Sequence, residues 1–424
     1  MVVPVVPRAW GLEPADTGRR YPVLRQIGLS VAQIEKRVRH NVQDWLPRQF
    51  LGDHGAFAGF YDARTRHFAP PQTANLIAPW ELLAAYDRLG GDEFLHRARS
   101  CLDWLHLHMV DDHPMSLVLG GVVDNLKPNQ VWTKYTADYV LSNLALYERT
   151  GDEELLRRAA QSGRFLIQSA SHGFRPKYDL WQERWLDQGW QSFGRVALAL
   201  WSLHKVTGET HWFERAVNWC QYGQTLAATN GCFYLVHEQY YSSDVAADEL
   251  RALLQLYLDT GYDSFLQAAT RFADWHVQAQ RPEGSWCLTV DRSEVPVGQY
   301  VGPGDIPNIA CALLLLHRHT DVLDYAASAV RAARYALSTQ AVPGTGQPYE
   351  EDESTHWGFW SWQPPYDYTM SVDQSTHHVR GLWAVIDYLS ALPAKAHKAI
   401  AERCGEPDAA RAAPGDAGDG CGAP

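Results

Sequence analysis

The stretch Thr150-Gly151-Asp152-Glu153-Glu154-Leu155 separates two helical patterns, and variants of it recur along the 424-residue chain. Related copies lie at residues 89–94, 207–212 and 260–265, and a degenerate copy without the glycine lies at 320–325. The glycine is suited to ending one helix, and the polar residues after it are suited to beginning the next. The copies follow one another at intervals of about 53 to 60 residues, and such a regular interval predicts a helical repeat.

The helices on the two sides of each turn differ in character. Segments before the turn are nearly continuously apolar, whereas segments after it have one apolar and one charged face. Helices that are apolar all round are buried, and amphipathic helices cover them. Inner helices are therefore expected at 74–89, 136–147, 193–206, 245–258, 306–317 and 375–389, and outer helices at 30–45, 92–110, 153–169, 210–227, 262–280 and 322–340. Six hairpins of this kind predict an all-α (α/α)6 toroid, with an open superhelix as the alternative.

The links from each outer helix to the next inner helix are long and rich in aromatic residues. They contain strand-like pieces such as 174–178, 233–236 and 286–290, while the opposite turns are short. Short β-hairpins are therefore expected in the loops on one face, where function is expected as well. The predicted toroid covers residues 27–403, between an extended N-terminal lead-in (1–26) and a tail (404–424) whose Ala, Gly, Pro and Asp content predicts disorder.

Composition and charge restrict the class of partner. The net charge of −12 argues against nucleic acid or an anionic membrane surface. No apolar run approaches the roughly 20 residues that span a bilayer, and the N-terminal residues lack the pattern of a signal peptide. The seven cysteines are scattered without a Cys-x-x-Cys pair, which favours reduced thiols in a cytoplasmic protein and argues against a zinc site. Neither a metal nor a cofactor is predicted, and the oligomeric state stays open.

The loop before the last inner helix and the start of that helix are the richest in binding groups. Aromatic faces beside hydrogen-bonding groups are suited to sugar rings, so a small carbohydrate is the predicted ligand. The candidate binding residues at this entrance are Trp357, Trp360, Trp362, Asp373, Gln374 and Arg380. Those near the other entrances are Trp80, Asn125, Trp132, Lys134, Tyr135, Trp190, Gln191, Arg195, Asp244, Arg251 and Asn308.

Two carboxyl groups stand out because they lie inside otherwise apolar helices. A position at the N-cap or in the first turn of a helix accounts for Asp305 and Asp373. It does not account as well for Asp138 and Asp248, whose burial needs a partner or water. Two carboxyl groups in different environments across a cavity can serve as acid and base, or as acid and nucleophile, in glycoside cleavage. Asp138 and Asp248 are therefore the predicted catalytic pair.

Histidines and cations at the entrances supply the other candidate groups. His377 and His378 are further catalytic candidates, but only one of two adjacent helical residues can face the axis squarely. Four cations lie near inner-helix starts, where the helix dipole disfavours positive charge: Lys134, Arg195, Arg251 and Arg380. They either pair with neighbouring carboxylates or recognise an anionic sugar such as a uronate.

With these hairpins and loops, residues 27–392 resemble the six-hairpin glycosidase-like superfamily in architecture. That superfamily includes unsaturated glucuronyl hydrolases, sugar epimerases of the N-acylglucosamine 2-epimerase type and some polysaccharide lyases. The resemblance implies a carbohydrate-active enzyme, and the histidine pattern expected of the epimerases is absent. The expected activity is hydrolysis of a small oligosaccharide, with uronic-acid-containing ones among the candidates.

Other functions stay open from the sequence. A lyase or epimerase would use Tyr135 and His377 or His378 as acid and base, with Asn125 and Arg195 neutralising a uronate. A terpene-cyclase-like enzyme would also be rich in aromatic residues, but no Asp-rich metal motif lies on a helix. A non-enzymatic helical-repeat binding protein is the remaining class, and it does not require so many ionisable groups on one face.

Overall fold

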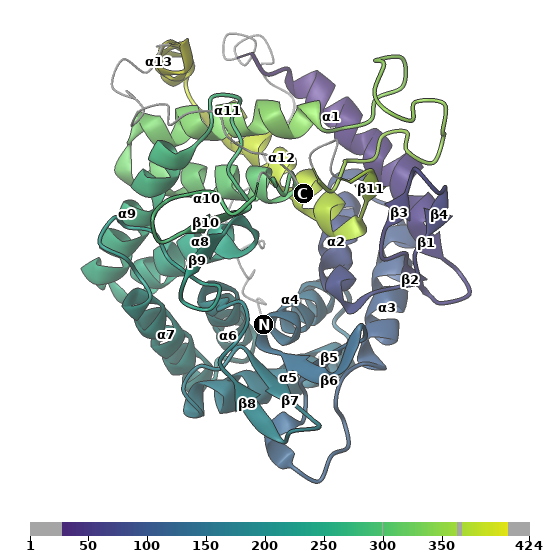
Figure 1. Cartoon of the computed structure of the whole chain (residues 1–424), viewed down its shortest axis with the longest axis vertical. Helices are drawn as coiled ribbons and strands as arrows, with labels where there is room; N and C mark the ends of the chain where they lie inside the picture. The colour runs from purple at the N-terminus through teal and green to yellow at the C-terminus, as the bar shows by residue number, and fades with distance from the viewer. Residues whose placement is uncertain (1–27, 299, 363–366, 406–424) are drawn as a thin grey trace, which may run out of the picture.

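Inner and outer helices alternate around a central axis in the computed structural model (Figure 1), which describes residues 28–298, 300–362 and 367–405. The inner helices are α2 (Ala78–Leu89), α4 (Thr133–Thr150), α6 (Phe193–Thr207), α8 (Ser243–Thr260), α10 (Asp305–Thr320) and α12 (Val372–Ala391). The outer helices are α1 (Val31–His40), α3 (Asp92–His106), α5 (Glu153–Ser171), α7 (Thr210–Thr225), α9 (Asp263–Ala279) and α11 (Leu323–Ser338).

Three copies of the recurring turn have the left-handed conformation that their glycine predicts, whereas Gly90 in the first copy has φ 74° and ψ −175°. Gly151, Gly208 and Gly261 adopt the left-handed conformation after α4, α6 and α8, with φ of 68°, 74° and 70°. In the degenerate copy Asp321 takes the same conformation, with φ 56°, which Asp tolerates better than most residues. After Gly151, the Asp152 side chain accepts a hydrogen bond from the Glu154 N–H at 3.0 Å and so begins α5.

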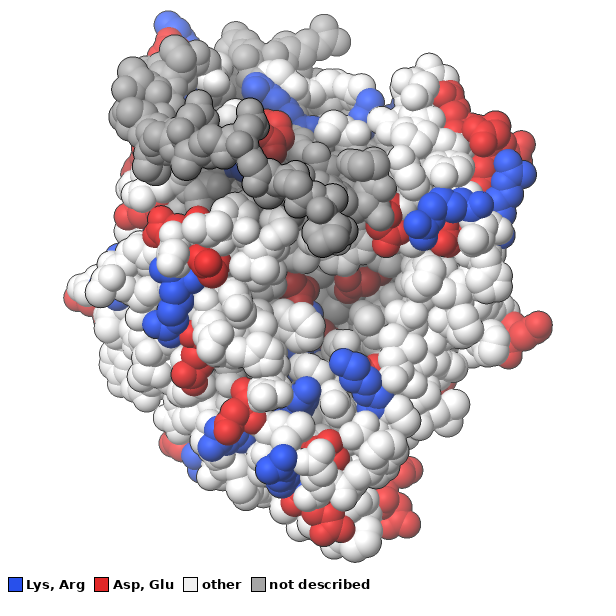
Figure 2. All heavy atoms as spheres, in the orientation of Figure 1, with Lys and Arg blue, Asp and Glu red and all other residues white. Residues whose placement is uncertain are grey.

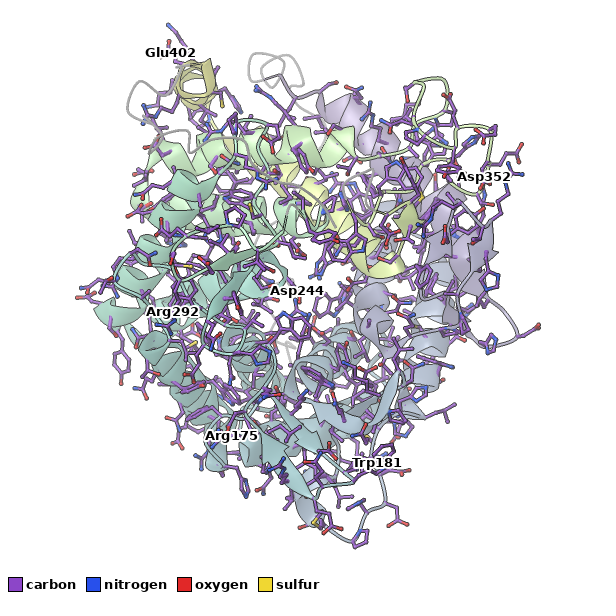
Figure 3. All side chains as sticks on the ribbon, viewed as in Figure 1. Arg175, Trp181, Asp244, Arg292, Asp352 and Glu402 are labelled. Atoms are coloured by element: carbon purple, nitrogen blue, oxygen red, sulfur yellow. The ribbon has the colours of Figure 1, made fainter. Side chains whose placement is uncertain are left out.

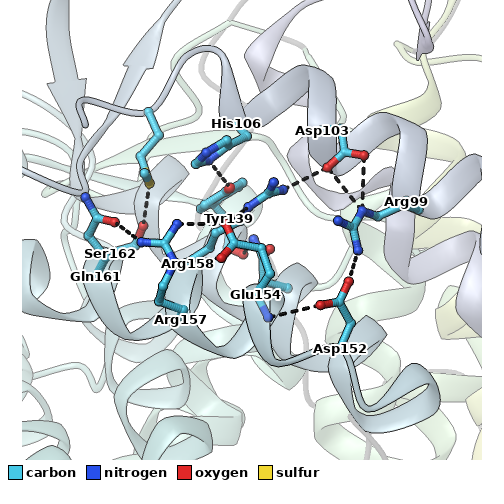
Figure 4. Close-up of polar contacts among 12 residues, drawn as sticks. Arg99, Asp103, His106, Tyr139, Asp152, Glu154, Arg157, Arg158, Gln161 and Ser162 are labelled. Carbon is cyan, nitrogen blue, oxygen red and sulfur yellow. Dashed lines mark hydrogen bonds and ion pairs between the residues drawn. The ribbon is translucent and has the colours of Figure 1, made fainter. Parts of the chain in front are cut away.

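Charged side chains join neighbouring outer helices where these face solvent. In Figure 4, Arg158 of α5 donates to Asp103 of α3 at 2.8 Å and to Glu154 of its own helix at 3.0 Å. Arg99 of α3 pairs with Asp152 at the start of α5. The charged faces that identified these helices as outer ones therefore connect one hairpin to the next.

The last inner helix closes the ring. Helix α12 packs against α10 on one side and against α2 and α1 on the other. At the closing contact, Ser375 Oγ lies 3.0 Å from Asn41 Oδ1 and 3.1 Å from Glu81 Oε1. Thr376 donates to Glu81 Oε2 at 3.1 Å. The predicted (α/α)6 toroid is confirmed, and the open superhelix is wrong.

Short antiparallel strands join the loops on one face of the ring, as predicted. β5 (Val122–Asp124), β6 (Lys127–Trp132), β7 (Lys177–Asp179) and β8 (Arg184–Leu186) form one sheet from two successive links. β9 (Tyr240–Ser242) pairs with β10 (Thr289–Asp291), and β1 (Phe50–Leu51) pairs with β2 (Ala56–Phe57). β11 (Thr369–Met370), β3 (Tyr61–Asp62) and β4 (His67–Phe68) form the last sheet, which connects the final link to the first.

Several predicted boundaries shift. The first outer helix is α-helical only to His40 and continues as a π-helical turn (Asn41–Trp45) and a 3-10 turn (Leu46–Gln49). Helix α13 (Ala394–Gly405) is absent from the prediction; it packs on α11, where Cys404 Sγ lies 3.7 Å from the Ala327 carbonyl. Helical structure therefore continues past residue 403. The predicted lead-in (1–26) and the tail from 406 onward lie outside the described residues.

Two general observations concern the part of the chain that the structure describes. Its six cysteines are free thiols, and all but Cys404 are buried. None of its helices combines the length and the apolar character needed to cross a lipid bilayer.

Candidate active site

Three alternate inner helices each carry a pair of polar residues four positions apart near their amino ends. Residues i and i+4 lie on the same face of a helix, so each of α4, α8 and α12 presents one pair. The upper tier, nearer the loops, consists of Lys134, Asp244 and Asp373, and the lower tier, one turn deeper, consists of Asp138, Asp248 and His377. Asp244 lies beside the central axis in Figure 3, and Figure 2 shows this face hollowed near its centre, with acidic and basic atoms around the opening. We call this the central hollow.

Upper-tier charges interact across the central hollow. Lys134 of α4 pairs with Asp244 of α8, and their side chains are 15% and 23% exposed. Burial favours a raised pKa for Asp244, but Lys134 and Arg195 outweigh it and lower the pKa to about 2. Burial and the charge of Asp244 raise the pKa of Asp373 to about 6. One carboxyl group of this tier is therefore held ionised, and its neighbour titrates close to neutrality.

The lower tier is organised by Arg195, which projects from α6 between α4 and α8. Its Nε donates to Asp248 Oδ2 at 2.6 Å and its Nη1 to Asp138 Oδ2 at 3.1 Å. Asp248 also accepts from Arg251 Nη1 at 3.2 Å. Burial raises the pKa of Asp138 to about 7 despite Arg195, whereas Arg195 and Arg251 outweigh burial and lower the pKa of Asp248. The two carboxyl groups that the sequence singled out thus share one guanidinium.

A glycine lets α6 approach α8 closely enough for this contact. The Gly194 N–H donates to the buried Glu249 carboxylate. A Cβ at Gly194 would collide with that carboxylate and with the Asp248 carbonyl. Because Arg195 follows directly, the close approach sets where its side chain enters the lower tier.

The two adjacent histidines point in different directions. His377 contacts the Asn308 side chain of α10, and burial, with Arg195 next, lowers its pKa to about 3. His378 instead bonds through Nδ1 to the Gln374 carbonyl at 2.8 Å and stacks on Phe359 with ring centroids 4.0 Å apart. His378 therefore lies outside the central hollow, and its predicted place at the site is wrong.

An aromatic cluster lies beside Lys134 at the rim of the central hollow. Trp190 is 40% exposed, and its ring lies 5.8 Å from that of Trp132 and 5.9 Å from Lys134 Nζ. The Tyr135 ring lies 6.0 Å from Trp132, and burial raises the pKa of Tyr135. Trp190 therefore offers the accessible aromatic face that a sugar ring needs.

Other aromatic candidates serve packing. Trp360 is only 1% exposed and belongs to the core. Trp357 stacks on His40 of α1 with centroids 4.3 Å apart. Trp80 is buried beneath the guanidinium of Arg380 at 4.4 Å. Trp362 is half-buried, 6.5 Å from Tyr300. Trp360 therefore has no exposed face for a sugar ring, contrary to the prediction, whereas a sugar-binding role for Trp357 stays a prediction.

Three predicted polar groups hold the loops together or lie just behind the rim. Asn125 accepts a hydrogen bond from the Thr73 N–H at 3.0 Å and so connects two links. Gln374 Oε1 accepts from the Gly304 N–H at 2.8 Å, at the start of α10. Gln191 is buried beside Trp190, and its Oε1 has no partner among the described residues.

Asp305 and Asp373 lie in the first turn of their helices, as the interpretation from sequence allows, but neither residue is the N-cap. The N-cap of α12 is Ser371, whose side chain accepts from the Gln374 N–H at 3.3 Å. The N-cap of α10 is Gly304, so Asp305 is the first helical residue. Its Oδ2 accepts from Ser243 Oγ at 2.8 Å, and burial and Asp244 raise its pKa. The glycine directly before Asp305 is the sequence signal that distinguishes this residue from a cap.

Within residues 28–298, 300–362 and 367–405, no three His, Cys, Asp or Glu side chains converge in a way that could hold a metal ion.

Comparisons with known proteins identify the fold. No family model matches the chain, and no curated protein matches its sequence. The cellobiose 2-epimerase from Spirochaeta thermophila DSM 6192 superposes with a TM-score of 0.69 at 14% identity, over 88% of this chain and 100% of that one. A D-mannose isomerase gives 0.67 at 12%, over 86% and 98%. The α-1,6-mannanase from Salegentibacter sp. HEL1_6 gives 0.58 at 15%, over 83% and 98%. The chain thus shares the (α/α)6 toroid fold of these proteins.

Proposed function

We propose that this protein is a carbohydrate-active enzyme that hydrolyses glycosidic bonds in the central hollow. The observation that carries the proposal is the different surroundings of two upper-tier carboxyl groups. Asp244 is paired with Lys134, which helps to lower its pKa to about 2, whereas burial and the charge of Asp244 raise the pKa of Asp373 to about 6. Glycoside cleavage needs one protonated carboxyl group for the leaving oxygen and one carboxylate as base or nucleophile. The sugar-processing proteins named above support a carbohydrate as the ligand.

Asp373 is the general acid in this proposal, and Asp244 is the ionised partner. Both side chains retain access to solvent, since Asp373 is half-buried and the Asp244 side chain is 23% exposed. Lys134 keeps Asp244 ionised, and Trp190 at the rim supplies the face on which a sugar ring stacks. A substrate entering from the loop side meets these groups first.

Asp138 and Asp248 are the competing assignment for the catalytic pair. Their pKa shifts also differ in direction, because the pKa of Asp138 is raised to about 7 while that of Asp248 is lowered. Asp138 is 3% exposed, however, and both carboxyl groups are bound to Arg195. A carboxyl group that is buried and already paired reaches a substrate less readily. We therefore assign Asp138 and Asp248 to holding Arg195 in the lower tier of the central hollow.

Sugar isomerisation or β-elimination is the second candidate function. It is favoured by the neutral imidazole of His377 in the lower tier, beside Asn308, with Tyr135 one tier above. A general base works best with a pKa near the operating pH. Burial instead lowers the pKa of His377 to about 3, so the imidazole is a weak base, and hydrolysis is the better-supported reaction.

One experiment separates these reactions. The protein is incubated in D2O with a panel of neutral, amino and uronic disaccharides, and the products are followed by NMR. Hydrolysis produces new reducing ends without exchange of carbon-bound hydrogen. Isomerisation exchanges a carbon-bound hydrogen for deuterium, and elimination produces an unsaturated sugar.

Variants connect the reaction to the upper tier. Asp373→Asn and Asp244→Asn are each expected to abolish the new reducing ends, while Glu214→Gln on the exposed face of α7 leaves them unchanged. Deuterium incorporation without new reducing ends would show isomerisation and would refute the assignment as a hydrolase. Sugar binding without any turnover would favour a binding protein.

A further inference from the structure

A cavity of about 570 Å³ lies on the loop face between two hairpin turns. One turn, at residues 237–240, runs into β9, and the other, at residues 291–293, begins at the end of β10. The two strands pair Tyr240 with Asp291 and so hold the turns side by side. Cavities of several hundred Å³ in which a few polar groups meet are typical ligand sites. The catalytic groups proposed above include none of the residues that line this cavity.

Both walls of the cavity are held in place by the protein itself. Arg292 Nε donates to the Glu238 carbonyl at 2.8 Å and so joins one turn to the other. The Arg292 guanidinium also lies over the Tyr234 ring, 5.4 Å from its centroid. Asp291 Oδ1 accepts from the Ser293 N–H at 2.8 Å and fixes the second turn. A site whose groups are already ordered loses less entropy when a ligand binds.

Two polar residues of the first turn occupy backbone positions that favour glycine and asparagine. His237 and Glu238 have φ of 53° and 56°, in the left-handed region. They reverse the chain between Val236 and Tyr240, which form a β-bridge. A turn with two left-handed residues most often contains Asn-Gly, and other residues there cost stability. Packing in the core does not offset that cost, because both residues are exposed, which favours a role in binding.

The cavity adjoins the aromatic platform at the rim of the central hollow. Trp190, which is 40% exposed, forms a β-bridge with Val236, the residue directly before the first turn. The His237 N–H donates to the Gly189 carbonyl at 3.4 Å. A sugar ring stacked on Trp190 would therefore have its next neighbour along the chain beside the cavity.

The cavity also lies within reach of the upper tier. Tyr240 precedes Asp244 by four residues, and four residues of extended chain span at most about 14 Å. In Figure 3 Arg292 lies outward from Asp244, away from the central axis. A short oligosaccharide covers such a distance, whereas a monosaccharide does not.

We propose that this cavity binds the outer sugar units of an oligosaccharide whose scissile bond lies in the central hollow. The proposal rests on the proposed function, because it takes the hollow as the place of cleavage. Glu238 and Asp291 offer carboxylate acceptors, and Arg292 offers guanidinium donors. Neutral hydroxyl groups both donate and accept, so they match this mixture better than a group of one charge does. The preferred substrate is therefore longer than a disaccharide, with an uncharged outer end.

The dependence of cleavage on chain length tests the proposal. Oligosaccharides of glucose and of mannose, β-1,4-linked and α-1,6-linked, are assayed from the disaccharide to the hexasaccharide. The value of kcat/KM is expected to rise at least about tenfold over each series that is cleaved, as one or two additional hydrogen bonds would produce. Calorimetry with the same hexasaccharides measures binding without turnover.

Variants assign the gain to the cavity. The double variant His237→Asn/Glu238→Gly removes both turn side chains and supplies the residues that this turn prefers, so its stability in urea should be at least that of the parent protein. It should lower the ratio of kcat/KM for the hexasaccharide to that for the disaccharide by about tenfold, and Arg292→Met should lower it as well. Arg66→Asn is the matched control, because Arg66 is also left-handed (φ 54°), 63% exposed and located between β3 and β4. It should leave the ratio unchanged.

Each outcome decides the proposal. Cleavage without a gain from chain length, or a gain that survives in both the double variant and Arg292→Met, would overturn it and leave the hydrolase assignment intact. Hexasaccharide binding without cleavage, lost in the double variant, would refute hydrolysis and retain the cavity as a sugar site. Absence of binding and cleavage in every neutral series would overturn the proposal, and the D2O experiment with disaccharides decides the proposed function separately.

Discussion

Replacing Arg195 by Met tests the lower tier most directly. The Arg195 side chain is 2% exposed and donates to Asp248 at 2.6 Å and to Asp138 at 3.1 Å. Methionine has a similar length and no charge, so the substitution removes both carboxylate bonds, and a longer bond from Nη2 to the Asp244 carbonyl at 3.4 Å, with little change in packing. Asp248 keeps its bond from Arg251 at 3.2 Å, whereas no other described hydrogen bond reaches Asp138. Most of the loss in unfolding free energy therefore comes from Asp138, which is left without a partner.

The expected loss follows from that unpaired carboxylate. Removing one partner of a buried ion pair costs about 3–5 kcal/mol, and the remaining bond on Asp248 favours the lower end, about 3 kcal/mol. Arg195 opposes the effect of burial on Asp138, whose folded pKa of about 7 is already above the ordinary 3.8. Without Arg195 that folded pKa rises further. A carboxyl group with a raised folded pKa loses its stabilising contribution as pH rises, so the variant loses more stability at pH 8 than at pH 5.

Urea unfolding at pH 5 and pH 8 measures the effect. Arg157→Met is the matched control, because Arg157 pairs with Glu154 at the surface, where the side chains are 57% and 38% exposed; it is expected to cost less than about 1 kcal/mol. The double variant Arg195→Met/Asp138→Asn should recover part of the loss at pH 8. A loss at pH 8 no larger than that of the control, or one that does not change with pH, would refute the reasoning.

The remaining predictions concern catalysis, ring closure and the tryptophans. With Asp373 as the acid and Asp244 as the base, kcat/KM should fall as pH rises through about 6 and as pH falls through about 2; a pH–rate profile without the upper limb would exclude Asp373. Burial raises the pKa of Glu81 to about 8 from 4.5, so its contribution to stability is present below pH 4.5 and lost as pH rises through 8. Glu81→Gln should accordingly flatten that decline in urea titrations, and an unchanged slope would contradict this. Trp360→Ala should cost about 3–5 kcal/mol of unfolding free energy, whereas Trp190→Ala should cost under about 1 kcal/mol and raise KM; similar losses in stability would show that the two tryptophans are not used differently.

The ring was predictable because its signals are local. The glycine turn at Gly151 and its equivalents, the apolar inner helices and the charged outer ones all repeat along the chain, and each repeat needs only its neighbours to fold. Even the degenerate copy fits, since Asp321 adopts the backbone conformation that glycine has elsewhere. Helix α13 gave no such signal, because it lies beyond the last repeat.

The residues that gather around the central hollow could be picked out one by one from the sequence, but their pairings could not. Asp138 and Asp248 stood out as carboxyl groups in apolar helices, and the structure brings them together on Arg195. Which cation meets which carboxylate depends on the geometry across the ring: Lys134 and Asp244 are 110 positions apart in sequence. The same holds for His377 and His378, because the rotation of α12 about its own axis decides which ring faces inward.

Ring closure by α12 also sets the order in which the protein becomes functional. Two of the six tier residues, Asp373 and His377, arrive only with this helix, and its contact between Ser375 and Asn41 spans 334 positions of the chain. A growing chain that has reached α11 has an open seam between α2 and α10, with their apolar sides exposed to solvent. Contacts of such long range form slowly, and the exposed seam is prone to aggregation until they form. The proposed substrate binding and catalysis should therefore appear together with resistance to aggregation, once α12 has closed the ring.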